Sequence, residues 1–175
     1  MSAASPPFDL ATINAMDRDA FVAVLGPTFE NSPWVAATAW FRRPFADLEA
    51  LHAAMLDVVR QAPEDRKLAF LCDHPELAGR EAQAGTMTTE STGEQGSAGL
   101  DALTGAERDE MQRLNQAYSE RHGFPFIIAV RGNTKQQIFE AMRARTAQTT
   151  EIERRAALEQ IGLITHGRIG ALING

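Results

Sequence analysis

Groups that could carry out acid–base chemistry are concentrated in one polar segment, residues 72–104. It contains the imidazole of His74, the carboxylate of Glu94 and the carboxamide of Gln95, among glycines and hydroxyl side chains. A histidine exchanges protons near neutral pH because its unperturbed pKa is about 6.5, and a carboxamide offers a donor and an acceptor to an amide or ureide. Ordering such a segment costs about 1 to 2 kcal/mol of backbone entropy per residue and buries little apolar area. We therefore expect this irregular, glycine-rich segment to carry the function.

Each of these residues also has an ordinary structural interpretation. A lone histidine is more often structural than catalytic, and His74 precedes Pro75, which favours a loop. The stretch from Ser91 to Glu94 fits a capping box, with Ser91 as the N-cap of a helix and Glu94 returning to its amide. The same helix N-terminus could instead present Glu94 and Gln95 to a ligand. The sequence leaves both interpretations open.

Metal and thiol chemistry are weakly supported. Asp73, His74 and Glu76 are too close along the chain to surround one ion by themselves, and no His-x-x-x-His pair exists. Cys72 is the single cysteine, which excludes an internal disulfide; we expect it to be a small buried hydrophobic residue in a reducing compartment. No Gly-x-Ser-x-Gly motif indicates a serine hydrolase. We expect no metal site.

The composition predicts a cytoplasmic globular protein. Of 175 residues 44% are hydrophobic and 23% charged, and no apolar run approaches the roughly 20 residues that cross a bilayer, so we expect no membrane association. The formal charge is −6 and the basic residues are dispersed, which argues against a nucleic-acid partner. Residues 1–12 are expected to be a disordered tail without signal-peptide features, and residues 13–175 a single domain.

Helices on both sides of the polar segment must position it. Ala, Leu, Glu, Arg and Gln recur at helical spacing, which predicts an all-α helical bundle with a polar active-site loop. The apolar run from Phe124 to Val130 contains a proline and is expected to be extended chain threaded through the core. The expected helix starts are Asp17 (N-cap), Pro33, Pro44, Glu64, Thr104, Asn133-Thr134 and Thr150, with capping boxes at Thr104 to Glu107 and Thr150 to Glu153.

Eight short motifs in a fixed order resemble one family, the 2-oxo-4-hydroxy-4-carboxy-5-ureidoimidazoline (OHCU) decarboxylases of urate degradation. The resemblance extends from about Ile13 to Ile173. The motifs are Phe29 to Ala36, Arg43 to Phe45, His74 to Gly79, Ser91 to Gln95, Ala98 to Leu100, Leu114-Asn115, Gly123 to Val130, and Lys135.

The resemblance implies a cofactor-free, all-helical, usually homodimeric carboxy-lyase that forms (S)-allantoin and carbon dioxide. It implies that His74 is the catalytic proton donor and that Glu94 is the essential carboxylate. Many vertebrate members end in a peroxisomal tripeptide, whereas this chain ends Ile-Asn-Gly, so a cytoplasmic location is expected. The substrate contacts that it implies are Pro75, Ser91, Thr92, Gly93, Gln95, Phe126, Ile127, Ile128, Ala129, Val130 and Arg168.

Two other functions stay open. Shared pocket residues would also suit a lyase or isomerase that acts on a different ureide. A polar segment on a helical scaffold would also suit a non-catalytic binding module. Turnover of the ureidoimidazoline substrate distinguishes the three.

Overall fold

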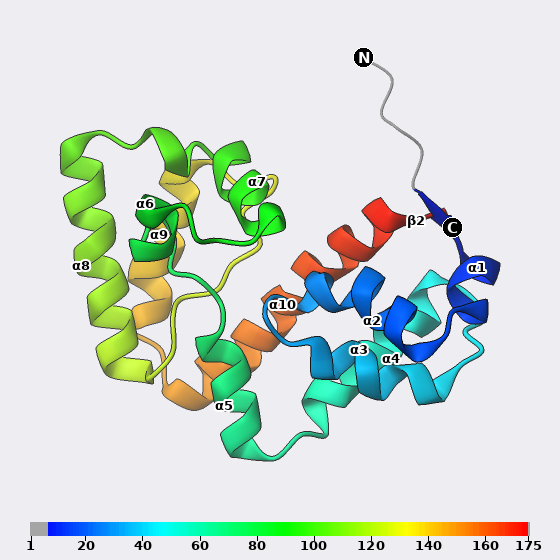
Figure 1. Ribbon diagram of the computed structural model, residues 1–175. Helices are drawn as coiled ribbons and strands as arrows, with labels where there is room; N and C mark the ends of the chain where they lie inside the picture. The colour runs from blue at the N-terminus through cyan, green and yellow to red at the C-terminus, as the bar shows by residue number, and fades with distance from the viewer. Residues whose placement is uncertain (1–6, 175) are drawn as a thin grey trace. The chain divides into compact units, whose positions relative to one another are not determined.

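The computed structural model describes residues 7–174, and nearly all of its regular structure is helical (Figure 1). The strands among these residues are β1 (Phe8–Asp9) and β2 (Ile173–Asn174), which pair in parallel. The predicted all-α class is therefore confirmed. Contacts divide the chain into two compact units: unit 1 contains the residues up to Lys67 and from Gly162 onward, and unit 2 contains Leu68–Ile161. The single domain over residues 13–175 stays a prediction.

Unit 1 consists of short helices around a buried apolar core that includes Phe21, Leu51 and Met55. Within it, α3 (Pro33–Ala39) packs against α2 (Arg18–Leu25) and α4 (Leu48–Arg60). Its elements are α1 (Leu10–Ala15), α2 (Arg18–Leu25), η1 (Gly26–Phe29), α3 (Pro33–Ala39), η2 (Trp40–Arg42), α4 (Leu48–Arg60), the first residues of α5 (Glu64–Cys72) and the end of α10 (Thr150–Leu172).

Side-chain caps fix where the first helices begin. Asp17 caps α2, as predicted, by accepting the Ala20 N–H at 2.8 Å. The helix expected from Pro44 instead begins at Leu48, because Asp47 accepts the Ala50 N–H at 2.7 Å. The expected tail of residues 1–12 differs as well: residues 1–6 lie outside the described part of the chain, whereas residues 8–12 form β1 and the start of α1.

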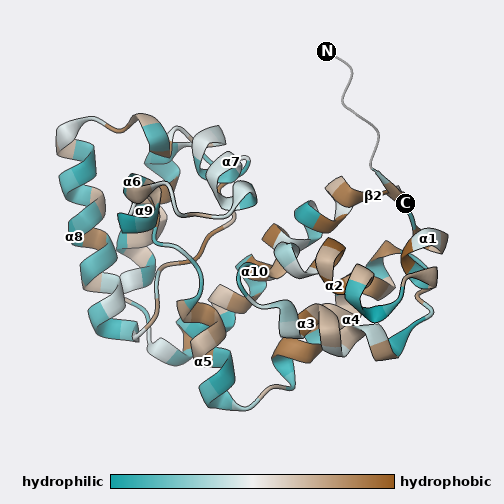
Figure 2. Cartoon of the chain, in the orientation of Figure 1, coloured by the Kyte–Doolittle hydropathy of each residue, from teal (hydrophilic) through white to brown (hydrophobic). Residues whose placement is uncertain are grey.

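Unit 2 holds the polar segment, which contains more helix than the sequence predicts. Its elements are the rest of α5, α6 (Arg80–Ala84), α7 (Thr89–Ser97), η3 (Leu100–Ala102), α8 (Gly105–His122), α9 (Lys135–Thr146) and the first half of α10. α8 packs beside α9 (Figure 1). Along the chain, the predicted extended segment from Phe124 to Val130 connects α8 to α9. It is hydrophobic, whereas the preceding helix α8 is largely hydrophilic (Figure 2).

The caps of unit 2 confirm two predictions and correct one. Thr104 forms its capping box with Glu107 at the start of α8, and the C-cap of α8 is Gly123, whose φ of 80° is left-handed. Thr134 caps α9, as predicted. The capping box expected at Thr150 is wrong, because α10 begins at Thr150 and the Thr149 hydroxyl accepts the Ile152 N–H at 3.3 Å.

Glu153 is instead the centre of a buried polar network. Its side chain is 1% exposed and accepts the Tyr118 hydroxyl at 2.6 Å and the Arg145 Nε–H at 3.0 Å. Burial and this carboxylate raise the pKa of Tyr118 far above its usual value. Arg145 also donates to the Ile127 carbonyl at 2.9 Å, so the network anchors the extended segment.

None of the helices in the described range is long and apolar enough to span a membrane.

Candidate active site

His74 lies two residues beyond α5, in the turn that leads to α6. The residue is 7% exposed, its ring packs edge-to-face on Phe70 at 5.2 Å, and its Nδ1 lies 3.1 Å from the Phe70 carbonyl oxygen. A carbonyl oxygen can only accept, so Nδ1 carries the hydrogen in the neutral ring. Nε2 is then the nitrogen that takes up and releases a proton.

The segment Ser91 to Gln95 lies inside α7 instead of at its start. α7 begins at Thr89, and Thr88 is the N-cap, accepting the Ser91 N–H at 3.2 Å. The predicted capping box with Ser91 as N-cap is therefore wrong, because Thr88 offers the same hydroxyl three residues earlier. Glu94 is likewise in the second turn of the helix, away from the free amides of its N-terminus.

Helical spacing divides these five residues between two faces of α7. Ser91, Glu94 and Gln95 are buried, with 4%, 9% and 6% exposure. Thr92 and Gly93 are exposed. Positions i, i+3 and i+4 of a helix share one face, so the buried hydroxyl, carboxylate and carboxamide project in the same general direction.

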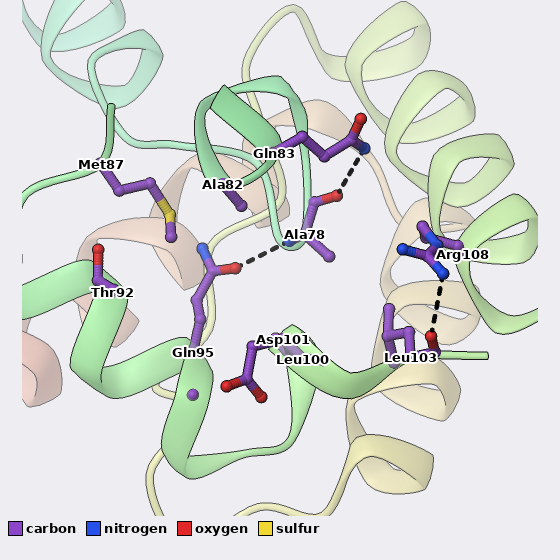
Figure 3. Close-up of a pocket in the computed structure, with 11 residues that line it drawn as sticks. Ala78, Ala82, Gln83, Met87, Thr92, Gln95, Leu100, Asp101, Leu103 and Arg108 are labelled. Carbon is purple, nitrogen blue, oxygen red and sulfur yellow. Dashed lines mark hydrogen bonds between the residues drawn. The ribbon is translucent and has the colours of Figure 1, made fainter. Parts of the chain in front are cut away.

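The carboxamide of Gln95 joins α7 to the turn that carries His74. Its Oε1 accepts the Ala78 N–H at 2.8 Å, and its Nε2 donates to the Glu76 carbonyl at 3.4 Å (the first is drawn in Figure 3). Gln95 thus brings the helix with Glu94 and the turn with His74 together in unit 2. Its predicted substrate contact stays a prediction, since these two bonds are made to protein backbone.

Two cavities adjoin this turn within unit 2. One, of about 250 Å³, lies between α6, α7 and η3, with Thr92, Gln95 and Ala78 in its wall (Figure 3). The other, of about 290 Å³, has His74 and Pro125 in its wall. Of the residues from Ser91 to Gln95, Gln95 therefore reaches the turn that carries His74, whereas Thr92 and His74 border different cavities. Pro75 is half-buried in the same turn.

Cys72, which also borders the second cavity, is exposed, so the prediction of a buried small hydrophobic residue is wrong. Its position at the last residue of α5, where the chain turns toward His74, explains the exposure. Partial burial and the neighbouring Asp73 carboxylate raise the pKa of the thiol. Both effects favour the protonated thiol.

The extended segment is held by side chains instead of by strand partners. Phe126, Ile127 and Val130 are at most 5% exposed, and Ile128 and Ala129 are half-buried. The Ala129 N–H donates to Gln160 Oε1 at 3.0 Å, and the Ala129 carbonyl accepts from Asn133 Nδ2 at 2.8 Å. The extended segment lies where the sequence predicted it, but the side chains that hold it were not predicted: Gln160 lies in α10, and Asn133 lies in the loop before α9.

Arg168 belongs to unit 1 and is buried there, not solvated. It is 7% exposed; its Nη2 pairs with Glu30 Oε1 at 2.8 Å, and its Nη1 donates to the Thr28 carbonyl at 3.4 Å. Removing one partner of a buried ion pair of this kind lowers the stability of the folded protein by about 3 to 5 kcal/mol, because the other charge is left buried without compensation. The predicted contact between Arg168 and substrate stays a prediction.

No cluster of three or more His, Cys, Asp or Glu side chains that could hold a metal ion occurs in the described range.

Gly79 gives the first testable prediction about the turn. A Cβ at this position would lie 2.6 Å from Glu76 Cβ, closer than packed carbon atoms approach. Gly79→Ala should therefore displace the turn, lower stability by about 1 to 3 kcal/mol and reduce any activity that depends on His74. Gly105→Ala is the matched control, because a Cβ there meets nothing within 4 Å. Chemical denaturation measures both, and equal stabilities would contradict the tight packing.

The fold and this site together define a class: a helical protein with a buried imidazole and a buried carboxylate in the same unit. Residues 14–170 match the family described as OHCU decarboxylase. A 2-oxo-4-hydroxy-4-carboxy-5-ureidoimidazoline decarboxylase of Mus musculus is 38% identical over 94% of this chain and 93% of its own length. One of Haloferax volcanii is 38% identical over 91% of this chain and 93% of its own length. The chain belongs to the OHCU decarboxylase family.

Solved structures agree with this assignment. The crystal structure of an (S)-allantoin synthase is similar with a TM-score of 0.76 and 29% identity over 95% of this chain, which spans 54% of that longer chain. A crystal structure of OHCU decarboxylase in the presence of (S)-allantoin has a TM-score of 0.67 over 90% of this chain and 98% of its own. At 18% identity the second similarity concerns the fold alone.

Proposed function

We propose that this protein is a carboxy-lyase that converts OHCU to (S)-allantoin and carbon dioxide in urate degradation. The observation that carries the proposal is His74, a buried imidazole whose Nδ1 is bonded to the Phe70 carbonyl and whose turn is joined by Gln95 to the helix with Glu94. Relatives that carry the decarboxylase name and align over nearly their whole length support it.

The substrate itself supplies the electron sink for this reaction. When carbon dioxide leaves C4, the bonding pair forms a double bond to C5 while the C5–N imine pair moves to nitrogen, which takes up a proton. The 4-hydroxyl then becomes a carbonyl, and a proton added to C5, the carbon that bears the ureido group, creates the stereocentre of allantoin. We therefore propose that the enzyme needs no metal or organic cofactor.

In this scheme His74 transfers protons and Glu94 orients the substrate. Nε2 of His74 would exchange a proton either with the 4-hydroxyl or with C5. A carboxylate only accepts hydrogen bonds, so Glu94 is suited to ring and ureido N–H groups. The other proposed contacts, from Pro75, the α7 residues and the extended segment, would hold the ring and limit its hydration. Exclusion of water weakens solvation of the leaving carboxylate.

Freshly generated OHCU tests the proposal, with circular dichroism following the appearance of (S)-allantoin. We expect rapid formation of the optically active product and the same rate after treatment with a strong chelator. A rate lost on chelation and restored by one metal would refute the cofactor-free mechanism. Calorimetric binding of allantoin without turnover would instead identify a binding module, and turnover of a different ureide would identify another lyase or isomerase.

We also propose that the protein acts as a homodimer in the cytoplasm. The family resemblance supports this proposal. Light scattering should give twice the chain mass, and a chain mass at micromolar concentration would refute the dimer.

A further inference from the structure

We propose that Asn115 is a positioning residue for His74, acting through the backbone of the turn that carries it. This inference rests on the proposed function, since it assigns His74 the proton-transfer role. The Leu114-Asn115 motif is one of those that mark the family resemblance, yet nothing in the proposed mechanism uses it.

Asn115 reaches the turn from α8. Its side chain is 4% exposed, and its Nδ2 donates to the Leu77 carbonyl at 2.9 Å in a buried hydrogen bond. The carbonyl can only accept, so the NH₂ group of the amide must face Leu77. The Oδ1 atom is buried and has no hydrogen-bond partner among the described residues. An unpaired buried acceptor is destabilising by about 1 to 3 kcal/mol, so stability alone gives little reason for an amide here.

The turn from His74 to Gly79 has few ways to absorb a displacement. Pro75 fixes its own φ, and Ala78 has a φ of 48°, a left-handed value that is unfavourable for a residue with a side chain. Gly79 leaves no room for a Cβ beside Glu76. A shift at Leu77 is therefore transmitted along the backbone toward His74 instead of being taken up locally.

Two helices hold this turn by side-chain amides. Gln95 of α7 binds the Ala78 N–H, and Asn115 of α8 binds the Leu77 carbonyl, so consecutive residues of the turn are fixed from two elements. Ser119, one helical turn after Asn115, donates to Glu76 Oε1 at 3.5 Å.

On the N-terminal side of the turn, the backbone N–H of His74 donates to the Leu71 carbonyl at 3.3 Å, and its ring Nδ1 bonds to the Phe70 carbonyl. The imidazole is thus placed by α5 before it and by the Leu77 and Ala78 bonds after it.

Asn115→Asp tests the positioning role with almost no change in side-chain size. The carboxylate removes the donor and places negative charge beside the Leu77 carbonyl. Misplacement of a reacting group by about 1 Å can reduce the rate by about a hundredfold, so we expect kcat to fall about 10- to 100-fold while KM changes less than about threefold. Gln112→Glu is the matched control: it makes the same change from amide to carboxylate on the exposed face of α8 and should leave both constants unchanged.

The imidazole signals of His74 provide a readout that does not depend on activity. The chain has four histidines, so nitrogen-15 spectra can be assigned by comparison with His74→Asn. Asn115→Asp should shift the His74 ring nitrogens and the midpoint of their pH titration, whereas Gln112→Glu should not. If Asn115→Asp fails to fold, Asn115→Leu removes the donor without adding charge and should give the same pattern.

Three outcomes decide the inference. Wild-type kcat with unchanged His74 signals in a folded Asn115 variant would overturn it. A lowered melting temperature with unchanged kcat and signals would show a structural role only, and would overturn it as well. A wild-type protein that does not decarboxylate OHCU would refute the proposed function, while the His74 spectra of the variants would still show whether Asn115 positions the ring.

Discussion

His74→Asn should reduce formation of (S)-allantoin to the uncatalysed rate, with binding of allantoin retained. Asparagine keeps a hydrogen-bonding side chain of similar size, but it has no group that exchanges a proton near neutral pH. A single positioned donor reaches one face of the planar intermediate, whereas water protonates both. The remaining product should therefore be racemic. Circular dichroism of the product over time, with calorimetric titration of allantoin into the variant, measures the two effects separately.

His166→Asn is the matched control for this substitution. Its side chain is 46% exposed and pairs with Glu49 in unit 1, so its loss should leave rate and optical purity unchanged. Rapid production of optically active allantoin by His74→Asn would show that another group delivers the proton.

Most helix starts outside the polar segment were predictable because their signals are local. A threonine followed three residues later by Glu or Gln marks a helix start, and it does so at Thr104 and Thr134. The extended segment was predictable too, since Pro125 and continuous apolar residues disfavour both a helix and a paired strand. The order of the motifs indicated the family for a similar reason, because it depends only on the sequence and not on contacts between distant residues.

The same local rules failed where several residues could play the same part. Thr88, Ser91 and Thr92 all carry a hydroxyl, and spacing alone did not identify Thr88 as the cap of α7. At the start of α10, Thr149 caps the helix in place of the neighbouring Thr150, whose own hydroxyl lies 2.9 Å from His122 Nδ1. Such choices depend on which side chain finds a partner elsewhere in the fold.

Sequence patterns did not predict the contacts between residues that are far apart in the sequence. Gln95 was expected to bind substrate, but no spacing rule could show that its amide also meets the backbone of Ala78, seventeen residues earlier. The bonds from Asn115 to Leu77 and from Arg145 to Ile127 are of the same kind. The sequence thus indicated which side chains are capable of acid–base and hydrogen-bonding chemistry. The structure adds the side-chain amides of Gln95 and Asn115 and the guanidinium of Arg145, which bind the backbone of the turn and of the extended segment.

Glu94→Gln should abolish turnover while changing stability little. The structure removes the competing explanation of a lost helix cap, because Thr88 caps α7 and Glu94 lies in its second turn on the buried face. Glutamine keeps the length and the hydrogen-bonding reach of the side chain but loses the charge and turns one acceptor into a donor. A substrate that presents N–H groups then meets a donor, so we expect kcat/KM to fall at least about a hundredfold, equivalent to about 2.7 kcal/mol of transition-state stabilisation.

Glu90→Gln makes the same substitution in the first turn of α7 and separates the two kinds of damage. A carboxylate there stabilises the positive end of the helix dipole by about 0.3 to 1 kcal/mol, so this control should lose a little stability and keep its activity. The opposite pattern is expected for Glu94→Gln, with an unchanged melting temperature and no turnover. Thermal denaturation and the circular-dichroism assay on both variants give the comparison. If Glu94→Gln keeps most of its activity, the carboxylate does not orient the substrate, and the buried face of α7 serves only to hold the turn that carries His74.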